Sequence, residues 1–261
     1  MNAKTRERLN AVNREFYAAQ ADAFDTSRNH AWPGWKRAIR DVCGKEARRP
    51  LRVLDVGCGN GRFADFLQEA AKNAPGEPLA LDYAGVDQSS ELLGIATNGH
   101  PGDGPDELKW IEGDVLAGQP GSALPPGPFD LVVAFGLLHH VPGLEQRKQL
   151  LAALGERIGS RGRLVFTVWQ FGRTKRFDGH VIPWEQYNAQ SEQPILTGEL
   201  EDGDYLLSFG ETTNPPRYCH HTGDSEFDQL IAATGLQRVD EFEADGRTAD
   251  LNRYAVLERV P

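Results

Sequence analysis

Three glycines stand at every second position of the segment Asp-Val-Gly-Cys-Gly-Asn-Gly, which runs from Asp55 to Gly61. Glycine allows a ligand to approach the backbone closely where the chain turns, because it has no side chain and adopts conformations that other residues avoid. The spacing is G-x-G-x-G and differs from the G-x-G-x-x-G of dinucleotide-binding turns. The segment is therefore either a binding turn for a small ligand or a plain glycine-rich turn.

Two carboxylates, Asp87 and Asp114, follow the glycine segment at the ends of later apolar runs. A carboxylate at the first of these places can accept hydrogen bonds from both hydroxyls of a ribose. The second can accept a hydrogen bond from the amino group of an adenine. Each acid taken singly could equally cap a helix or end a loop. Their order along the chain, with the turn at Phe135 and Gly136 behind them, indicates a pocket for a nucleoside cofactor.

Two pairs of adjacent histidines, at 139–140 and 220–221, could take part in proton transfer. Imidazole titrates near neutral pH, so His140 and His220 are candidate general bases for an acceptor that carries a hydroxyl or an amine. An acceptor that is already a carboxylate needs no base, and the histidines would then only shape the pocket. Adjacent side chains point in different directions on regular structure and no carboxylate spacing completes a ligand set, so we expect no metal site.

The elements that must position these residues follow from the alternation of apolar runs with helical stretches. This pattern predicts an α/β fold with a mainly parallel sheet and crossover helices. Strands are expected at 51–56, within 79–87, and at 108–111, 129–135 and 163–169, and helices at 62–73, 89–96 and about 144–158. In an open α/β sheet small ligands bind at the carboxyl ends of the strands, which is where the glycine segment and both acids fall.

The remainder of the chain divides into a cap, an insertion and a final part of the core. The turn at 159–162 precedes the fifth strand, and residues 172–216 are too long and too rich in Gly, Pro and aromatic residues for an ordinary connection. A helix is expected at 224–234, followed by strands at 236–243 and 253–260 that form an antiparallel hairpin at the sheet edge. We therefore divide the chain into a helical cap (1–50), a core (51–171), a lid for the substrate (172–216) and the end of the core (217–261).

The glycine segment and the two acids, in this order on successive strand ends, resemble the class I S-adenosylmethionine-dependent methyltransferases from about residue 15 to the end. The resemblance implies a Rossmann-like seven-stranded sheet whose last strand is antiparallel, and S-adenosylmethionine as the cofactor. It implies that the glycines contact the amino-acid end of the cofactor, Asp87 the ribose, and Asp114 with Val115 the adenine. The predicted cofactor-binding residues are Tyr17, Arg28, Asp55, Gly57, Cys58, Gly59, Gly61, Asp87, Gln88, Asp114, Val115, Phe135 and Gly136.

Three further motifs resemble a narrower family, the methyltransferases that esterify a carboxymethyl group on the wobble uridine of tRNA. They are an N-terminal pattern of aromatic residues from Phe16 to Trp35, the segment Val181–Trp184 and the segment Arg217–His220. Cys219 stands where that family has a second tyrosine, and His180 stands where it has an acid. Both departures lie in the expected substrate region. This resemblance also implies a small activating subunit as a partner.

Side chains that could hold the acceptor gather in the same segments. Arg28 and Arg217 each offer a planar fork for a carboxylate, which would align the acceptor oxygen with the methyl group. Trp32 and Trp184 can stack on a planar ring or a base, whereas Trp35 and Trp169 are expected to pack the lid against the core. The predicted substrate-binding residues are Trp32, Trp184, Arg217 and Tyr218.

The composition of the chain disfavours several classes of function. The chain has 261 residues and a net charge of −10, which disfavours a free-standing nucleic-acid binder, although residues 1–50 contain eleven Lys or Arg against six Asp or Glu. Three widely spaced cysteines form neither a disulfide framework nor a zinc motif. The polar start and the lack of a long apolar run predict a cytoplasmic protein with no membrane association.

Three functions remain open from the sequence. The first is methylation of a modified wobble uridine in tRNA, by in-line transfer from S-adenosylmethionine. The second is methylation of an oxygen or nitrogen of a small molecule on the same scaffold, which the acidic body and the two departures favour. The third is a non-catalytic protein that binds the cofactor and modulates a partner, which the intact glycine segment and acids disfavour.

Overall fold

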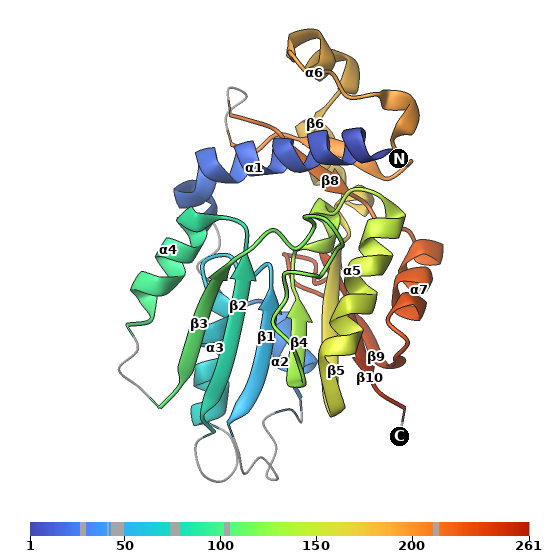
Figure 1. The fold of residues 1–261 in the computed structure, drawn as a ribbon. Coiled ribbons are helices and arrows are strands. Elements are labelled where there is room, and N and C mark those ends of the chain that lie inside the picture. Colours follow the sequence, from blue (N-terminus) through green and yellow to red (C-terminus); the bar gives the residue numbers. More distant parts are fainter. Residues whose placement is uncertain are drawn as a thin grey trace.

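A seven-stranded sheet forms the centre of the computed structural model, which describes residues 1–26, 30–40, 42, 50–73, 79–101, 105–210 and 214–260 (Figure 1). The strand order is β3-β2-β1-β4-β5-β10-β9. The first five strands in the chain pair in parallel, and β10 pairs antiparallel with both β5 and β9. The predicted α/β class with a reversed last strand is therefore confirmed. The bounds of the strands are β1 Leu51–Val56, β2 Leu81–Asp87, β3 Glu107–Glu112, β4 Phe129–Ala134, β5 Ile158–Trp169, β9 Gln237–Ala244 and β10 Asn252–Glu258.

Helices cover both faces of this sheet and bury an apolar layer on each. The helices α5 (Leu144–Arg157) and α7 (Asp224–Ala233) cover one face, and α2 (Pro33–Ala38) and α3 (Arg62–Lys72) cover the other (Figure 1). The helix α4 (Ser90–Gly99) packs near the β3 edge. Strands buried on both faces read as nearly continuous apolar runs, which is why the sequence locates β1 and β4 so closely.

One predicted turn lies inside a strand. Residues 159–162, expected as the turn before the fifth strand, belong to β5, which starts at Ile158 and pairs with β4 through an irregular register. Gly162 lies against the neighbouring strand so closely that a Cβ atom there would be 2.6 Å from the carbonyl oxygen of Phe129. Gly162 therefore allows β5 to approach the backbone of β4 closely.

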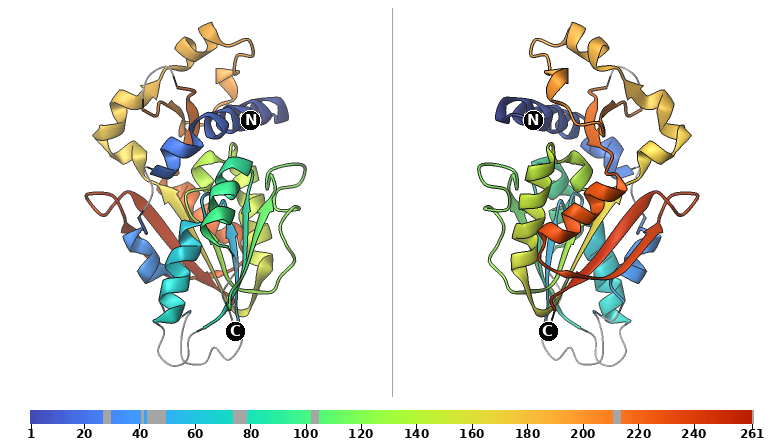
Figure 2. Two further views of the ribbon diagram at one scale, coloured as in Figure 1. Left: turned by 90° about the vertical axis from the view of Figure 1, so that its left-hand side faces the viewer. Right: turned by 90° about the vertical axis from the view of Figure 1, so that its right-hand side faces the viewer.

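A second, smaller sheet lies with the helix α1 (Ala3–Thr26) above the carboxyl ends of the central strands (Figures 1 and 2). It contains β6 (Val181–Ile182), β7 (Asp204–Leu207) and β8 (Arg217–His220), all antiparallel. Short helices connect its parts: η2 (Phe171–Arg173), η3 (Lys175–His180), α6 (Trp184–Gln190) and η4 (Thr197–Glu199). The pairing of β8 with β7 joins the predicted lid to residues beyond 216. In the part of the chain that is described, no helix has both the length and the apolar character that crossing a membrane requires.

Candidate functional site

The glycine segment forms a tight turn between β1 and α3. Gly57, Gly59 and Gly61 all have positive φ angles, of 77°, 54° and 81°, which favour glycine. A Cβ atom on Gly59 would meet only Leu92, at 3.9 Å, so the backbone here faces open space. A Cβ atom on Gly61 would instead be 2.8 Å from Trp110. The third glycine is therefore required by packing against β3, and the second leaves room for a ligand.

A cavity opens over this turn, and we call it the proximal cavity. Eleven of the thirteen residues that the sequence assigns to cofactor binding line this cavity, together with the candidate base His140. Gly61 does not line the cavity, and Arg28 lies outside the described residues. The predicted residues that line the cavity are Tyr17, Asp55, Gly57, Cys58, Gly59, Asp87, Gln88, Asp114, Val115, Phe135, Gly136 and His140.

The carboxylate of Asp87 is fixed at the end of β2 by the backbone. Its Oδ2 accepts a hydrogen bond from the N–H of Gly59 at 2.8 Å, and its Oδ1 accepts one from the N–H of Ser89 at 2.9 Å. Burial raises the pKa of Asp87, although these hydrogen bonds oppose the rise. At the end of β3, Oδ1 of Asp114 accepts a hydrogen bond from the N–H of Leu116 at 2.9 Å. Both acids therefore stand where the sequence places them, each with lone pairs left for a ligand.

A second buried acid, Asp55, lies below the turn. Its Oδ2 accepts a hydrogen bond of 2.5 Å from the hydroxyl of Tyr83. Burial raises the pKa of Asp55 to about 7; the hydrogen bond from Tyr83 lowers it and the charge of Asp87 raises it. A cationic ligand next to this pair of acids would favour their ionised forms. The proximal cavity is thus suited to a ligand that carries positive charge.

His140, in the short helix η1 (Leu138–His140), bridges the large and small sheets. Its Nδ1 lies 2.8 Å from the backbone carbonyl oxygen of Tyr218, and its Nε2 lies 2.9 Å from the hydroxyl of Tyr17. A carbonyl oxygen only accepts hydrogen bonds, so Nδ1 carries a proton; when the ring is neutral, Nε2 accepts from the Tyr17 hydroxyl. This tautomer leaves a basic nitrogen facing the helix α1 at the wall of the proximal cavity.

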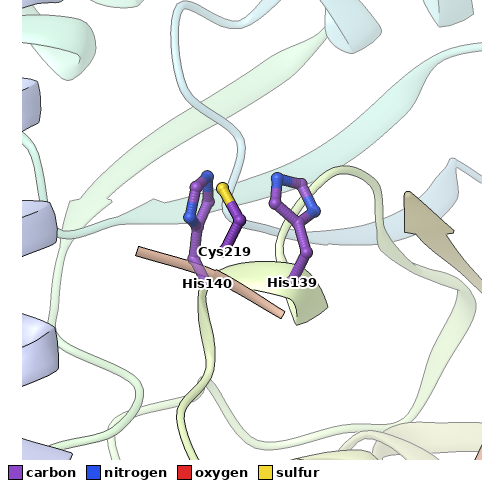
Figure 3. Close-up of side chains that lie close together, drawn as sticks. All are labelled: His139, His140 and Cys219. Carbon is purple, nitrogen blue, oxygen red and sulfur yellow. The ribbon is translucent and has the colours of Figure 1, made fainter. Parts of the chain in front are cut away.

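Figure 3 shows the thiol of Cys219 beside the rings of His139 and His140. The expectation that the two rings diverge is wrong, because η1 is a 3-10 turn and holds their centroids 4.1 Å apart. The three possible ligand atoms lie within 4.8 Å of one another. The two nitrogens of His140 already face the Tyr17 hydroxyl and the Tyr218 carbonyl. His139 and Cys219 therefore pack around a ring whose nitrogens have other partners. The absence of a metal site stays a prediction.

His220 does not have the surroundings of a general base. Its two ring nitrogens lie 2.7 Å from Oδ1 of Asp204 and 2.8 Å from Oε2 of Glu226. Burial lowers the pKa of His220, but the hydrogen bonds to the two carboxylates outweigh burial and raise the pKa. The ring is thus a cation that donates from both nitrogens, and it lines neither described cavity. The predicted catalytic role of His220 is replaced by a structural one.

The buried cation Arg147 completes this network. Its Nε donates to Glu226 at 2.7 Å, and its Nη2 donates to Glu201 at 2.5 Å. Arg147 belongs to α5, Glu226 to α7, and Glu201 to the segment before β7. The network with His220 of β8 therefore ties the small sheet to two helices of the core.

A second cavity, of about 830 Å³, lies under the small sheet, and we call it the distal cavity. Its aromatic lining comes from Trp32, Trp169, Phe177 and Phe209. Arg62 lines both cavities. Trp32 also approaches the proximal cavity, because a Cβ atom on Gly136 would lie 3.2 Å from its ring. The two cavities therefore adjoin one another.

Arg217 is a buried cation on the wall of the distal cavity. Its side chain is 5% exposed, and neither Nε nor Nη1 has a hydrogen-bond partner among the described residues. Its guanidinium lies over three aromatic rings, 5.0 Å from the centroid of Trp169, 5.5 Å from that of Phe209 and 5.6 Å from that of Phe16. Aromatic faces attract a cation but provide no hydrogen-bond acceptor of the usual kind. An anion that entered the cavity would complete this site.

Two predicted substrate residues lie elsewhere. Trp184 begins α6 and packs against the cluster of Leu9 and Leu206, away from both cavities. Tyr218 is fully buried, and its hydroxyl donates to Asp204 at 2.6 Å. Tyr218 contributes to the site only through the carbonyl that orients His140. No local sequence pattern predicts that these two side chains lie outside the cavities, because their positions depend on how the small sheet packs on α1.

The sequence also misses residues that the structure places at the site. Trp169, expected to pack only, both packs and lines the distal cavity. Arg62, directly after the glycine segment, lines both cavities, and burial lowers the pKa of its guanidinium to about 10. Arg176 and Arg247 line the distal cavity from segments far apart in the chain. Only Arg62 had a signal in the sequence, namely its place next to the turn.

Comparisons with known proteins agree with this arrangement. A family model described as a methyltransferase domain matches residues 24–239. A protein of Encephalitozoon cuniculi described as a methyltransferase is 24% identical over 247 residues, which cover 94% of this chain and 93% of the relative. A ubiquinone biosynthesis O-methyltransferase of Burkholderia orbicola is 31% identical over 109 residues, 42% of this chain and 39% of that protein. The crystal structure of an S-adenosylmethionine-dependent methyltransferase from Clostridium acetobutylicum matches with a TM-score of 0.63 at 14% identity, covering 94% of this chain and 99% of the other.

Proposed function

The chain belongs to the methyltransferase domain family, and we propose that it transfers the methyl group of S-adenosylmethionine to a small, planar, anionic acceptor. The distal cavity carries this proposal, because it adjoins the proximal cavity and holds the buried guanidinium of Arg217, whose Nε and Nη1 have no hydrogen-bond partner among the described residues. A buried charge left unpaired is costly, so an anionic ligand gains a strong charge-assisted contact at Arg217.

The proximal cavity fits S-adenosylmethionine. The open space at Gly59 admits the amino-acid end of the cofactor, Asp87 is oriented to accept from the ribose hydroxyls, and Asp114 stands near the adenine. The two buried acids Asp55 and Asp87 disfavour a phosphate, and a cationic ligand would favour their ionised forms. When bound, S-adenosylmethionine supplies an electrophilic methyl group on a positively charged sulfur.

The protein's own residues then bind and orient the acceptor. Arg217 holds its anion, and the aromatic walls of the distal cavity exclude water and fix the plane of a ring. An acceptor carboxylate needs no base. For a hydroxyl acceptor, Nε2 of His140 can take the proton through Tyr17, because Nδ1 keeps its own proton on the Tyr218 carbonyl.

The relatives support a small acceptor. The matched Burkholderia protein is named an O-methyltransferase of ubiquinone biosynthesis, although the match spans 39% of it. A cavity of about 830 Å³ is of the size of ordinary small-molecule sites.

The test is incubation with S-adenosylmethionine labelled in the methyl group, offered separately with a metabolite extract and with total tRNA. We expect label in a small molecule whose unmethylated form is anionic; if the acceptor atom is a carboxylate oxygen, the labelled product is its methyl ester. Asp87→Ala should abolish binding of S-adenosylhomocysteine in calorimetry, and Arg217→Gln should preserve that binding while transfer falls about 30-fold or more, since removing one partner of a buried charge pair costs 2–5 kcal/mol. Labelling only of molecules whose unmethylated form carries no anionic group would contradict the assigned role of Arg217.

The second candidate is a carboxymethyl group on a tRNA wobble uridine. Its support is that the segments Val181–Trp184 and Arg217–His220, which carry the resemblance, flank the same small sheet and supply β6 and β8. Label in the RNA fraction, with affinity for tRNA that falls steeply with salt, would establish this candidate over the small molecule.

A further inference from the structure

We propose that the distal cavity has a second anion subsite, formed at its rim by Arg176 and Arg247, so that the acceptor carries two anionic groups at opposite ends of a planar body. The inference rests on the proposed function and extends it to a narrower class of acceptor, aromatic dianions. Arg217 takes the inner anion, and the rim arginines take the outer one.

The rim arginines come from two segments that converge on the cavity. Arg176 lies in η3, and Arg247 lies in the turn between β9 and β10; both line the distal cavity. Figure 2 shows the η2–η3 region directly above the tip of the β9–β10 hairpin. Both side chains are exposed, in contrast to Arg217. The cavity thus has two cations at its wall, Arg62 and Arg217, and two exposed cations, Arg176 and Arg247.

Neither rim arginine has an anionic partner in the described protein. Arg176 lies 5.1 Å from the ring of Phe177, and no hydrogen bond or ion pair joins Arg176 or Arg247 to a described residue. The neighbouring Arg173 behaves differently, because it pairs with Glu243 and Asp224 outside the cavity. The chain as a whole has a net charge of −10, whereas these two arginines at one cavity have no anionic partner among the described residues.

The one carboxylate among the described residues that line the distal cavity is not paired with either rim arginine. Asp245 is buried, and its Oδ1 accepts from the N–H of Gly34 at 2.9 Å. Its Oδ2 accepts from Asn252 at 2.9 Å and from the hydroxyl of Tyr254 at 2.5 Å. Asp245 is thus committed to holding α2 against the end of the sheet. Four arginines and this one aspartate line the cavity, so the charge of its lining is positive on balance.

The two subsites differ in burial, and this difference predicts how much each contributes to the binding affinity. The inner anion meets a desolvated guanidinium, which favours a strong and specific contact. The outer anion meets exposed arginines, whose pairs are screened by water and are each worth at most about 1 kcal/mol. The aromatic walls between them accept a flat spacer. The second anion should therefore add a modest increment of affinity on top of the first.

Binding of rigid probes to the complex with S-adenosylhomocysteine tests the proposal. The probes are benzoate, which has one anionic group, terephthalate, which has two carboxylates, and 4-sulfobenzoate, which is also a dianion and has a sulfonate in place of one carboxylate. By calorimetry we expect either dianion to bind about three- to tenfold more tightly than benzoate. Whichever dianion binds more tightly shows whether the outer subsite prefers a carboxylate or a sulfonate.

Three variants test which residues cause the tighter binding of the dianions. In the double variant Arg176→Gln and Arg247→Gln the advantage of the dianions should fall to within about twofold, with affinity for benzoate retained. Arg217→Gln should weaken all three probes. Arg161→Gln is the matched control for removal of a positive charge, because Arg161 is exposed on β5 and lies outside the cavity.

Equal affinity for benzoate and both dianions in the unmodified protein would overturn the proposal. So would an advantage that survives in the double variant, or one that Arg161→Gln removes to the same extent. These outcomes are separate from failure of the proposed function, since the probes are measured without methyl transfer. Methylation of a monoanion with no dianion preference would leave the proposed function standing and remove the outer subsite.

Discussion

The hydroxyl of Tyr17 lies 2.9 Å from Nε2 of His140, and this bond joins α1 to η1 at the wall of the proximal cavity. The same ring is held from its other side by the carbonyl of Tyr218, 2.8 Å from Nδ1. One imidazole thus links the N-terminal helix, the end of β4 and the small sheet. The cavity wall is built from parts of the chain that are more than a hundred residues apart.

Removal of the Tyr17 hydroxyl should loosen this wall. In Tyr17→Phe the buried Nε2 of His140 loses its donor, which costs about 1–3 kcal/mol. We expect affinity for S-adenosylhomocysteine to fall by about tenfold in calorimetry, since roughly 1.4 kcal/mol corresponds to that factor. Tyr205→Phe is the control, because the Tyr205 hydroxyl makes no hydrogen bond with a described residue. Equal affinities for the two variants would show that the bond does not support the cavity.

Stability of the cofactor-free protein should depend on pH through Asp55. Burial raises the pKa of Asp55 in the folded protein to about 7, from the ordinary value of 3.8. The folded protein therefore holds this proton more tightly than the unfolded chain, and the stabilisation is complete below about pH 4 and is lost as pH rises towards 7. Asp55→Asn stays neutral and keeps an oxygen that can accept from Tyr83.

Urea unfolding at several pH values between 5 and 8 checks this expectation. The free energy of unfolding of the parent protein should decline relative to that of Asp55→Asn, with a slope of at most about 1.4 kcal/mol per pH unit up to pH 7. Above pH 7 the two profiles should run parallel. Profiles that are parallel throughout would refute the raised pKa. Binding of a cationic cofactor should strengthen over the same interval, as Asp55 ionises.

The sequence predicts the proximal cavity because its parts are local. The turn at 57–61 follows β1 directly, and Asp87 and Asp114 stand at or just beyond the ends of strands that apolar runs reveal. The distal cavity is different, since its cations are contributed by α3, η3, β8 and the β9–β10 turn. No periodicity or spacing relates these segments, so only the tertiary packing of the small sheet shows that they meet.

The histidines show the same limit. At the level of sequence His140 and His220 are equivalent, each in an adjacent pair beside apolar residues. Their chemistry is decided by distant partners: a carbonyl and a phenol for His140, two carboxylates for His220. The first has an Nε2 that can accept a proton from Tyr17 when the ring is neutral, and the second is held as a cation between two acids. Residue type alone cannot separate these outcomes.

His220→Gln should separate stability from function. Glutamine carries no charge and cannot donate to Asp204 and Glu226 from the positions of both ring nitrogens, so the buried network loses a cation. Breaking a buried charged pair costs about 3 kcal/mol, and we expect a loss of that order in the free energy of unfolding measured with urea. Affinity for S-adenosylhomocysteine should stay within about twofold, because His220 lines neither cavity. A stable variant that binds the cofactor but has lost transfer would restore His220 as a base.

Two glycines of one turn should respond differently to the same substitution. Gly59→Ala and Gly61→Ala each place a side chain at a positive φ angle, which costs about 1–2 kcal/mol. At Gly61 the added Cβ would also lie 2.8 Å from Trp110 and 3.0 Å from Ala96, and such overpacking costs about 1–3 kcal/mol more. At Gly59 the Cβ meets nothing nearer than 3.9 Å and projects into space that the cofactor needs.

Urea unfolding and calorimetry with S-adenosylhomocysteine, performed on both variants, distinguish the two roles. Gly61→Ala should lose about 2–4 kcal/mol of stability, and its folded fraction should retain most of the affinity. Gly59→Ala should lose less stability and at least about tenfold in affinity, because a methyl group that blocks a close backbone approach removes a ligand contact. The reverse order would mean that the ligand approaches the third glycine of the turn, and that the space at the second is not part of the binding site.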